Sequence, residues 1–250
     1  MARKRCRTST PAVDKNGGMA HVLRFLPRQS LSSMAQSSRA WHALVHRYFC
    51  LMQEDLSGGL ELSLAIPVVN TVDSERYPQG FVYQTSTTSI GGMNLPPPLE
   101  RHVPVEVFKH HRTGWSVRAT TAIGSVDSFI GEYVGRIVRT ATMDRTSRYI
   151  VSIREEDKDS GGMIWRTNVD ARDVGNFTRF INHSCMPNAR WDTYRSPTSF
   201  FPRIHVMSLR AIDAGEEITV DYGAAAGIGT THCHCGTATC RGFLPFDSTL

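Results

Sequence analysis

Three segments in the second half of the chain carry the side chains with the most chemistry. Residues 179–188 read Arg-Phe-Ile-Asn-His-Ser-Cys-Met-Pro-Asn, residues 215–222 read Gly-Glu-Glu-Ile-Thr-Val-Asp-Tyr, and residues 233–240 read Cys-His-Cys-Gly-Thr-Ala-Thr-Cys. Thiols, imidazoles, carboxamides and a phenol can bind a metal, hold a polar ligand and polarise a reacting bond. A functional site is therefore expected where these segments meet.

The cysteines predict a structural zinc site. Tetrahedral zinc takes deprotonated sulfur ligands, and the spacing Cys-x-Cys-x4-Cys surrounds only part of an ion. The three close ligands are Cys233, Cys235 and Cys240. Cys185 is the natural fourth ligand, while His232 and His234 are the competing ones. Four sulfur ligands leave no open position for metal catalysis, so the ion is expected to fold the chain and pin its tail over the Asn182-His183 loop.

Disulfides are the other use of six cysteines. Three of the six lie within eight residues, and Cys-x-Cys is too tight for an unstrained bridge between immediate neighbours. Cys6 and Cys50 have no such grouping. Metal thiolates in a reducing compartment are favoured over disulfides.

The composition indicates a soluble, intracellular globular protein. Hydrophobic residues make up 40% and charged residues 20% of the 250 residues, which is ordinary for such a protein. No apolar run approaches the roughly 18 residues of a membrane helix, and no signal-peptide core follows the basic start.

The positive charge is concentrated at the N-terminus. Residues 1–50 hold nine Lys or Arg and one Asp, whereas the other 200 residues hold nineteen Lys or Arg and twenty-two Asp or Glu. The slightly acidic remainder suits a basic peptide substrate better than a phosphate-rich one.

The chain is expected to contain five segments. Residues 1–18 predict a disordered basic leader, which is either a nuclear-import signal, a weak nucleic-acid contact or a solvated tail. A helical segment over 19–60 comes next, then a lead-in and proline-rich linker over 61–100, a main domain over 101–225 and a zinc-binding tail over 226–250.

The helical segment has two interpretations. Apolar residues recur at helical spacing between 20 and 51, and Pro27 divides the run because proline cannot donate a hydrogen bond inside a helix. The pattern over 25–45 partly resembles an F-box, a module that docks on a ubiquitin-ligase adaptor. A helical appendage of the main domain is the plainer alternative.

The rest of the chain predicts a β-rich domain with long functional loops. Residues 61–70 alternate well enough for a strand. From residue 103 onward, short apolar runs are separated by turn formers, and the expected strands lie over 115–119, 129–134, 149–153, 204–209 and 217–220.

The order of these motifs resembles the SET domain of protein lysine methyltransferases, over residues 101 to 243. The matching segments are Gly-Trp-Ser-Val-Arg-Ala (114–119), Glu-Tyr-Val-Gly (132–135), Gly-Asn-Phe-Thr-Arg-Phe-Ile-Asn-His-Ser-Cys (175–185), Gly-Glu-Glu (215–217) and Asp-Tyr-Gly (221–223). The resemblance is closest to the suppressor-of-variegation and euchromatic type, which methylates histone H3. The cysteine-rich pre-SET cluster of that type is absent, whereas residues 67–75 resemble its lead-in.

This resemblance implies the β-clip fold of short sheets with a knot-like crossing, S-adenosylmethionine as cofactor, one structural Zn2+, a histone tail as substrate and a nuclear, chromosomal location. It implies that Tyr222 and Tyr133 orient the lysine amine. The residues implied to hold the cofactor are Gly114, Trp115, Tyr149, Arg179, Asn182, His183 and Tyr222.

Two positions depart from the family pattern. Ser116 stands where a second glycine is usual, so the backbone approach to the cofactor is expected to be tighter or shifted. Val220 replaces a frequent aromatic residue two positions before Tyr222, which leaves room for di- or trimethylation. These departures keep an inactive chromatin-binding module open as an alternative, beside the adaptor-type protein.

Overall fold

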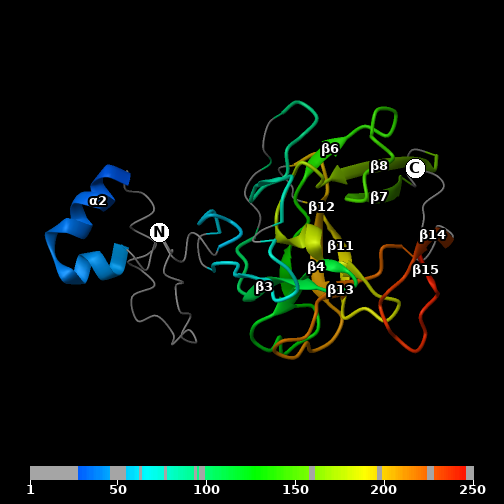
Figure 1. The fold of residues 1–250 in the computed structure, drawn as a ribbon. Coiled ribbons are helices and arrows are strands. Elements are labelled where there is room, and N and C mark those ends of the chain that lie inside the picture. The colour runs from blue at the N-terminus through cyan, green and yellow to red at the C-terminus, as the bar shows by residue number, and fades with distance from the viewer. Residues whose placement is uncertain are drawn as a thin grey trace.

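A computed structural model describes residues 28–45, 55–61, 64–75, 78–92, 95, 99–157, 161–195, 199–223 and 228–245. Short strands dominate the described part and gather into several small sheets (Figure 1). The mainly-β fold expected from the sequence is confirmed. The basic leader over 1–18 lies outside the described residues.

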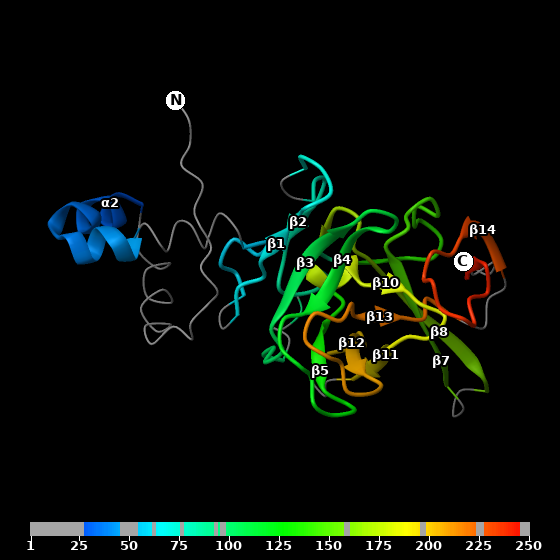
Figure 2. The ribbon, with the colours of Figure 1, turned by 60° about the horizontal axis from the view of Figure 1, so that its bottom comes forward.

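The helical segment forms a small unit with a core of its own. Helix α2 (Arg28–Ser37) begins directly after Pro27, and residues 39–45 are also helical. Leu31 and Val45 are buried together, and the partly buried residues around them are Met34, Ala35, Trp41 and Leu44. Figures 1 and 2 draw this unit apart from the sheets. The F-box-like role of this unit stays a prediction. None of the described helices is long and apolar enough to cross a membrane.

Three sheets of three strands build most of the domain. The first is β1 (Val68–Val69), β3 (Val105–His110) and β4 (Gly114–Ala119), with β3 in the middle. The second is β6 (Arg136–Val138), β8 (Met163–Asp170) and β7 (Ile150–Asp157). The third is β11 (Ala189–Tyr194), β12 (Arg203–Ser208) and β5 (Phe129–Glu132). The strands expected around 115–119, 129–134, 149–153 and 204–209 are therefore confirmed.

Three pairs of short strands connect these sheets. Strand β10 (Asn182–His183) runs parallel to β13 (Thr219–Val220), with Asn182 opposite Thr219, and the two lie side by side in Figure 2. Strand β2 (Val82–Tyr83) pairs with β9 (Val174–Gly175), which precedes a 3-10 helix (Phe177–Phe180). The C-terminal hairpin is β14 (Ile228–His232) and β15 (Phe243–Pro245).

The main core lies between the first and third sheets. Val105 and Val107 of β3 and Val117 and Ala119 of β4 are every second residue along their strands, and all four are buried in this core. Fully burying one such valine contributes roughly 1.5–3 kcal/mol. Val220 of β13 belongs to this core, so its packing anchors the segment that ends in Tyr222.

The lead-in segment is braced without metal ligands among the described residues. Strand β1 pairs in parallel with β3, and Lys109 forms ion pairs with Asp73 and Glu75. The buried Arg101 donates to the carbonyl of Leu64 at 2.7 Å. The strand expected over 61–70 is shorter than predicted in its described part, residues 61 and 64–70. Ile66 is held by the Asp55 loop there, and only residues 68–69 meet β3.

Gly135 permits a close approach between the main chains of β6 and β8. A Cβ added to Gly135 would lie 2.5 Å from the main-chain oxygen of Asp170, a distance that no side chain tolerates. The motif Glu-Tyr-Val-Gly therefore lets β6 pack directly on the end of β8.

Candidate functional site

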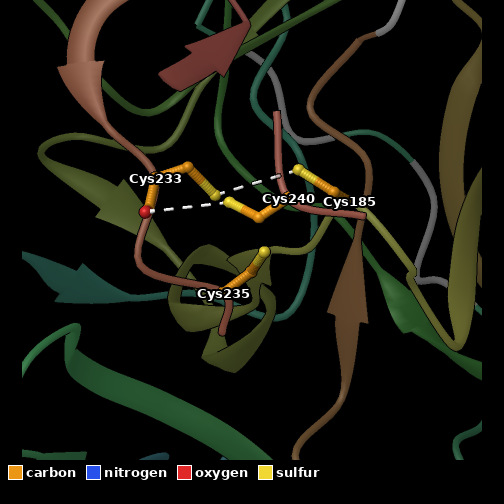
Figure 3. A group of neighbouring side chains, drawn as sticks. All are labelled: Cys185, Cys233, Cys235 and Cys240. Carbon is orange, nitrogen blue, oxygen red and sulfur yellow. Dashed lines mark hydrogen bonds between the residues drawn. The ribbon is translucent and has the colours of Figure 1, made fainter. Parts of the chain in front are cut away.

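The four cysteines expected to bind zinc converge in space. Their sulfur atoms all lie within 4.8 Å of one another, and the Sγ atoms of Cys185 and Cys233 are 3.9 Å apart (Figure 3). A tetrahedral zinc–thiolate site with bonds of about 2.3 Å requires sulfur atoms roughly 3.8 Å apart. The quartet therefore fits one zinc ion. The competing ligands His232 and His234 are not in the cluster, and His232 stacks on Phe243 instead.

The cluster joins two distant parts of the chain. Cys185 follows β10, whereas the other three cysteines lie between β14 and β15. The N–H of Cys233 donates to the carbonyl of Gly242 at 2.9 Å, which closes the tail on itself. The N–H of Arg241 donates to the sulfur of Cys185 at 3.3 Å. An ion at this position would pin the tail over the β10 loop.

His183 lies between the cysteine cluster and Tyr222. The main-chain N–H of Tyr222 donates to Nδ1 of His183 at 3.2 Å, and Nε2 is 3.4 Å from the sulfur of Cys185. Burial lowers the pKa of His183, although Asp221 opposes that effect. The imidazole therefore links the metal cluster to the segment that carries the candidate catalytic hydroxyl.

Both candidate catalytic tyrosines donate to main-chain carbonyls. The Tyr222 hydroxyl donates to Ile181 at 2.9 Å, and the Tyr133 hydroxyl donates to Tyr149 at 2.7 Å. Burial raises the pKa of both phenols, and for Tyr133 the nearby Tyr222 raises it further. Although 45% of Tyr222 as a residue is exposed, its hydroxyl is held by the main-chain carbonyl of Ile181. Each phenol therefore stays neutral and offers a ligand only the lone pairs of its oxygen.

Arg179 supports Tyr149. Its guanidinium lies 4.0 Å from the centre of the Tyr149 ring and donates to the carbonyls of Ala171 and Arg172 at 2.9 and 3.1 Å. Only 8% of Arg179 is exposed, and burial lowers its pKa. Its guanidinium donates to carbonyls of the protein itself, so its main role is to support the Tyr149 side of the site.

Asn182 ties β10 to β4. Its Nδ2 donates to the hydroxyl of Ser116 at 2.7 Å, to Glu217 Oε1 at 3.1 Å and to the carbonyl of Trp115 at 3.3 Å. Ser116 is fully buried. The serine that departs from the family glycine thus supplies a partner for Asn182, a contact that sequence reasoning missed.

Gly114 lies at an open part of the structure, next to Trp115. Gly114 has a φ of +78°, a conformation that side chains rarely adopt, and an added Cβ would meet no described atom within 4 Å. The indole Nε1 of Trp115 is buried without a hydrogen-bond partner among the described residues. A buried donor without a partner costs about 1–3 kcal/mol, so this nitrogen is suited to a ligand.

Asn188 is a second residue that sequence reasoning missed, although it ends the quoted 179–188 segment. Its side chain donates to the carbonyl of Glu217 at 2.8 Å and accepts from the N–H of Thr219 at 2.9 Å. Only 2% of Asn188 is exposed. It locks the cysteine-containing loop to the segment that leads into Tyr222.

The structure therefore brings the sequence-predicted residues into one region. Contacts link Tyr133 to Tyr149 and Arg179, link Tyr222 to His183 and the cysteines, and link Asn182 to Trp115. Residues 114–223 match the family model described as the SET domain. These residues form a SET domain.

The sequence is similar to proteins that carry the name histone-lysine N-methyltransferase. Human "Histone-lysine N-methyltransferase SETMAR" is 32% identical over 167 residues, which is 58% of this chain and 24% of that protein. Its bovine counterpart is 31% identical and is covered to 54%. The chain thus spans between about a quarter and about half the length of these relatives.

Solved structures show the same SET fold. Arabidopsis thaliana SUVH6 in complex with SAM superposes with a TM-score of 0.61 at 25% identity, over 77% of this chain and 56% of that one. The methyltransferase domain of human SETMAR superposes with a TM-score of 0.63 at 22% identity, over 78% of this chain and 98% of that one.

A buried ion pair lies beside Tyr133 in the SET domain. Oε2 of Glu132 accepts from Arg203 at 2.9 Å, and the two side chains are 1% and 5% exposed. Burial raises the pKa of Glu132 to about 7, although Arg203 opposes that effect. This pair holds β5 against β12 one residue before Tyr133.

Proposed function

We propose that this chain is an S-adenosylmethionine-dependent protein lysine N-methyltransferase that acts on a histone H3 tail. The observation that carries the proposal is the pair of neutral phenols, Tyr133 and Tyr222, each donating its only hydroxyl hydrogen to a main-chain carbonyl. Both oxygen atoms are thereby left as hydrogen-bond acceptors, that of Tyr222 next to the Asn182-His183 loop and that of Tyr133 next to Tyr149. Such acceptors suit an amine and its methyl groups.

The residues fit the proposed cofactor. The unpartnered Nε1 of Trp115 and the open space at Gly114 are the features that a bound ligand would use. When bound, S-adenosylmethionine would supply an electrophilic methyl group on a sulfonium centre. Asn182 and His183 would hold the cofactor through polar contacts, His183 mainly by its main chain. The remaining cofactor-binding residues proposed are Tyr149, Arg179 and Tyr222.

The chain's part in the reaction is to present a neutral, aligned amine. Free lysine has a pKa near 10.4, so only roughly a thousandth is neutral at physiological pH. Apolar surroundings at the proposed site would lower that pKa, because burial disfavours the ammonium form. Tyr222 and Tyr133 would accept from the amine and fix its direction, and alignment of this kind can supply several kcal/mol of the barrier reduction.

The proposed zinc ion has a structural role and takes no part in the reaction. Cys185, Cys233, Cys235 and Cys240 use all four tetrahedral positions, so no site remains for a reacting molecule. The ion would hold the tail over β10. Loss of the ion is expected to loosen the site although it performs no chemistry.

A histone tail is the proposed partner. The matched relatives carry the name histone-lysine N-methyltransferase, and residues 51–250 carry an excess of acidic side chains that suits a basic peptide. This partner implies a nuclear, chromosomal location. A weak nucleic-acid contact of the basic N-terminus is part of the same proposal.

Transfer of tritium from labelled S-adenosylmethionine to a histone mixture tests the function. The expected result is labelled histone H3 with the wild-type chain and a strong loss with Tyr222→Phe. Labelled H3 that is equal for both proteins would contradict the role of Tyr222. No label on any histone would favour an inactive chromatin-binding module instead.

A further inference from the structure

Two contacts run from the cysteine cluster to the start of the Tyr222 turn, one to the main chain of Tyr222 and one to the side chain of Asp221. One passes through His183, whose Nε2 is 3.4 Å from Cys185 Sγ and whose Nδ1 accepts from the N–H of Tyr222. The other passes through Arg241, which follows Cys240 directly and donates to Oδ1 of Asp221 at 2.8 Å. Both contacts begin at the metal cluster and end next to Tyr222.

The hydrogen bonds fix the tautomer of His183. Because Nδ1 accepts from a main-chain N–H, the ring hydrogen of the neutral imidazole is on Nε2. That hydrogen points toward the sulfur of Cys185, and a metal-bound thiolate is an acceptor. Arg241 also lies 3.3 Å from Nε2, but two donors cannot bond to each other. The hydrogen bond of this guanidinium nitrogen therefore goes to Asp221.

Asp221 holds the turn that contains Tyr222. Its Oδ1 accepts from the N–H of Gly223 at 3.0 Å as well as from Arg241. The carboxylate thus fixes the main chain after Tyr222, while His183 fixes the N–H of Tyr222 itself. The hydroxyl then reaches Ile181. A shift of the tail would move the whole turn.

From this geometry we infer that Arg241 and Asp221 are a positioning pair that, with His183, couples the occupied metal cluster to the placement of the Tyr222 hydroxyl. The inference rests on the proposed function for its catalytic consequence. Of the proposed cofactor residues, Arg241 meets only His183 among its described contacts, and it approaches the imidazole rather than the main chain that would hold the cofactor. Its effect is therefore on the rate of the reaction more than on cofactor affinity.

Reciprocity follows from the same link. If the metal cluster orders the Tyr222 turn, a disordered turn must weaken the cluster by the same factor. Breaking the pair at either end should then weaken zinc binding, and a weaker complex is expected to release zinc faster because affinity differences between variants are mostly differences in dissociation rate. Since both substitutions break one interaction, their effects should not multiply.

Zinc release to the chelating dye 4-(2-pyridylazo)resorcinol tests the link without any methyl acceptor. The proteins compared are zinc-loaded wild type, Arg241→Met, Asp221→Asn, the double variant and a control, Arg190→Met, whose exposed ion pair with Asp127 lies outside the network. Each single variant is expected to lose zinc about tenfold faster than wild type, the double variant no faster than the faster single one, and the control at the wild-type rate. Wild-type release from both single variants, or an approximately hundredfold effect in the double variant, would overturn the inference.

Steady-state kinetics supply the second readout. With one zinc per chain verified by elemental analysis, Arg241→Met should lower kcat about tenfold and change the KM for cofactor less than about twofold. Arg241→Lys, which keeps the charge, should recover part of kcat. Should Arg241→Met fail to fold by circular dichroism, Asp221→Asn, which keeps the side-chain shape, decides the same question.

The two proposals fail differently. If wild type transfers no methyl group, the proposed function fails, while zinc release still decides the link. If wild type is active and Arg241→Met matches it in both kcat and zinc release, the link fails and the proposed function stands.

Discussion

The hydroxyl of Tyr133 donates to the main-chain carbonyl of Tyr149 at 2.7 Å. That carbonyl also accepts from the N–H of Ala171 at 3.0 Å, so the loop before β7 is tied both to β8 and to a proposed catalytic residue. The hydrogen bond between Tyr133 and Tyr149 thus positions both residues. It also helps to place Arg179, whose guanidinium lies over the Tyr149 ring.

Replacing Tyr133 with phenylalanine should lower kcat by roughly tenfold. The loss of one oriented acceptor and of one net hydrogen bond of about 1 kcal/mol explains this size. Because Ala171 still donates to the Tyr149 carbonyl, the thermal unfolding midpoint should fall only slightly. A kcat equal to wild type would exclude the Tyr133 oxygen from the reaction.

Ser116 gives a prediction about cofactor affinity. Replacing it with alanine removes the 2.7 Å acceptor of Asn182 and keeps the backbone restricted, whereas Ser116→Gly removes the acceptor and frees the backbone. Both should raise the KM for S-adenosylmethionine roughly tenfold, with a smaller change in kcat. Unchanged cofactor binding by calorimetry in Ser116→Ala would mean that Glu217 and Trp115 hold Asn182 without the serine.

Glu132 predicts a pH dependence of stability. Its pKa in the folded protein is raised from 4.5 to about 7 by burial. Between these values the folded state keeps a proton that the unfolded state has released. The contribution of Glu132 to stability is therefore present at low pH and lost as pH rises to about 7, by up to about 3 kcal/mol.

Comparison of wild type with Glu132→Gln isolates this effect. His183 and His205, whose pKa values burial lowers, change stability in the opposite direction, since their contribution appears as pH rises. The difference in urea unfolding free energy between the two proteins should change in favour of Glu132→Gln from pH 5 to pH 7.5. Asp127→Asn, at an exposed site, is the matched control. A difference that does not vary with pH would contradict the raised pKa.

Val220 predicts the degree of methylation. Its side chain is fully buried two residues before Tyr222. We expect a larger ring at this position to take up room that a methylated amine beside Tyr222 would need. Mass spectrometry should find di- or trimethylated product with wild type and a lower degree with Val220→Phe, at a cost of about 1–3 kcal/mol of stability from overpacking. Only monomethyl product with wild type after long incubation would refute the spacious-site hypothesis.

Motif order and metal-ligand spacing predicted much of this site. Cys185 and the tail cysteines meet as the need of zinc for a fourth ligand predicted, although spacing alone left His232 and His234 open for that position. The strands after residue 103 followed from short apolar runs. The strand over 61–70 was overestimated, since alternation says nothing about Asp55, which captures the N–H of Ile66.

Long-range polar contacts were the part that the sequence could not supply. Asn188, Ser116 and Arg241 act through partners 31, 66 and 20 positions away, and no local pattern encodes such distances. Ser116 in particular looked like a defect in a glycine motif, whereas its hydroxyl is a buried partner of Asn182.

The most direct test of the central claim is methyl transfer from tritiated S-adenosylmethionine to histone H3 by the zinc-loaded chain and its Tyr222→Phe variant. The expected result is labelled H3 with wild type and a rate about a hundredfold lower for the variant, with zinc content unchanged. Label that is absent with wild type, or equal for both proteins, would contradict the account.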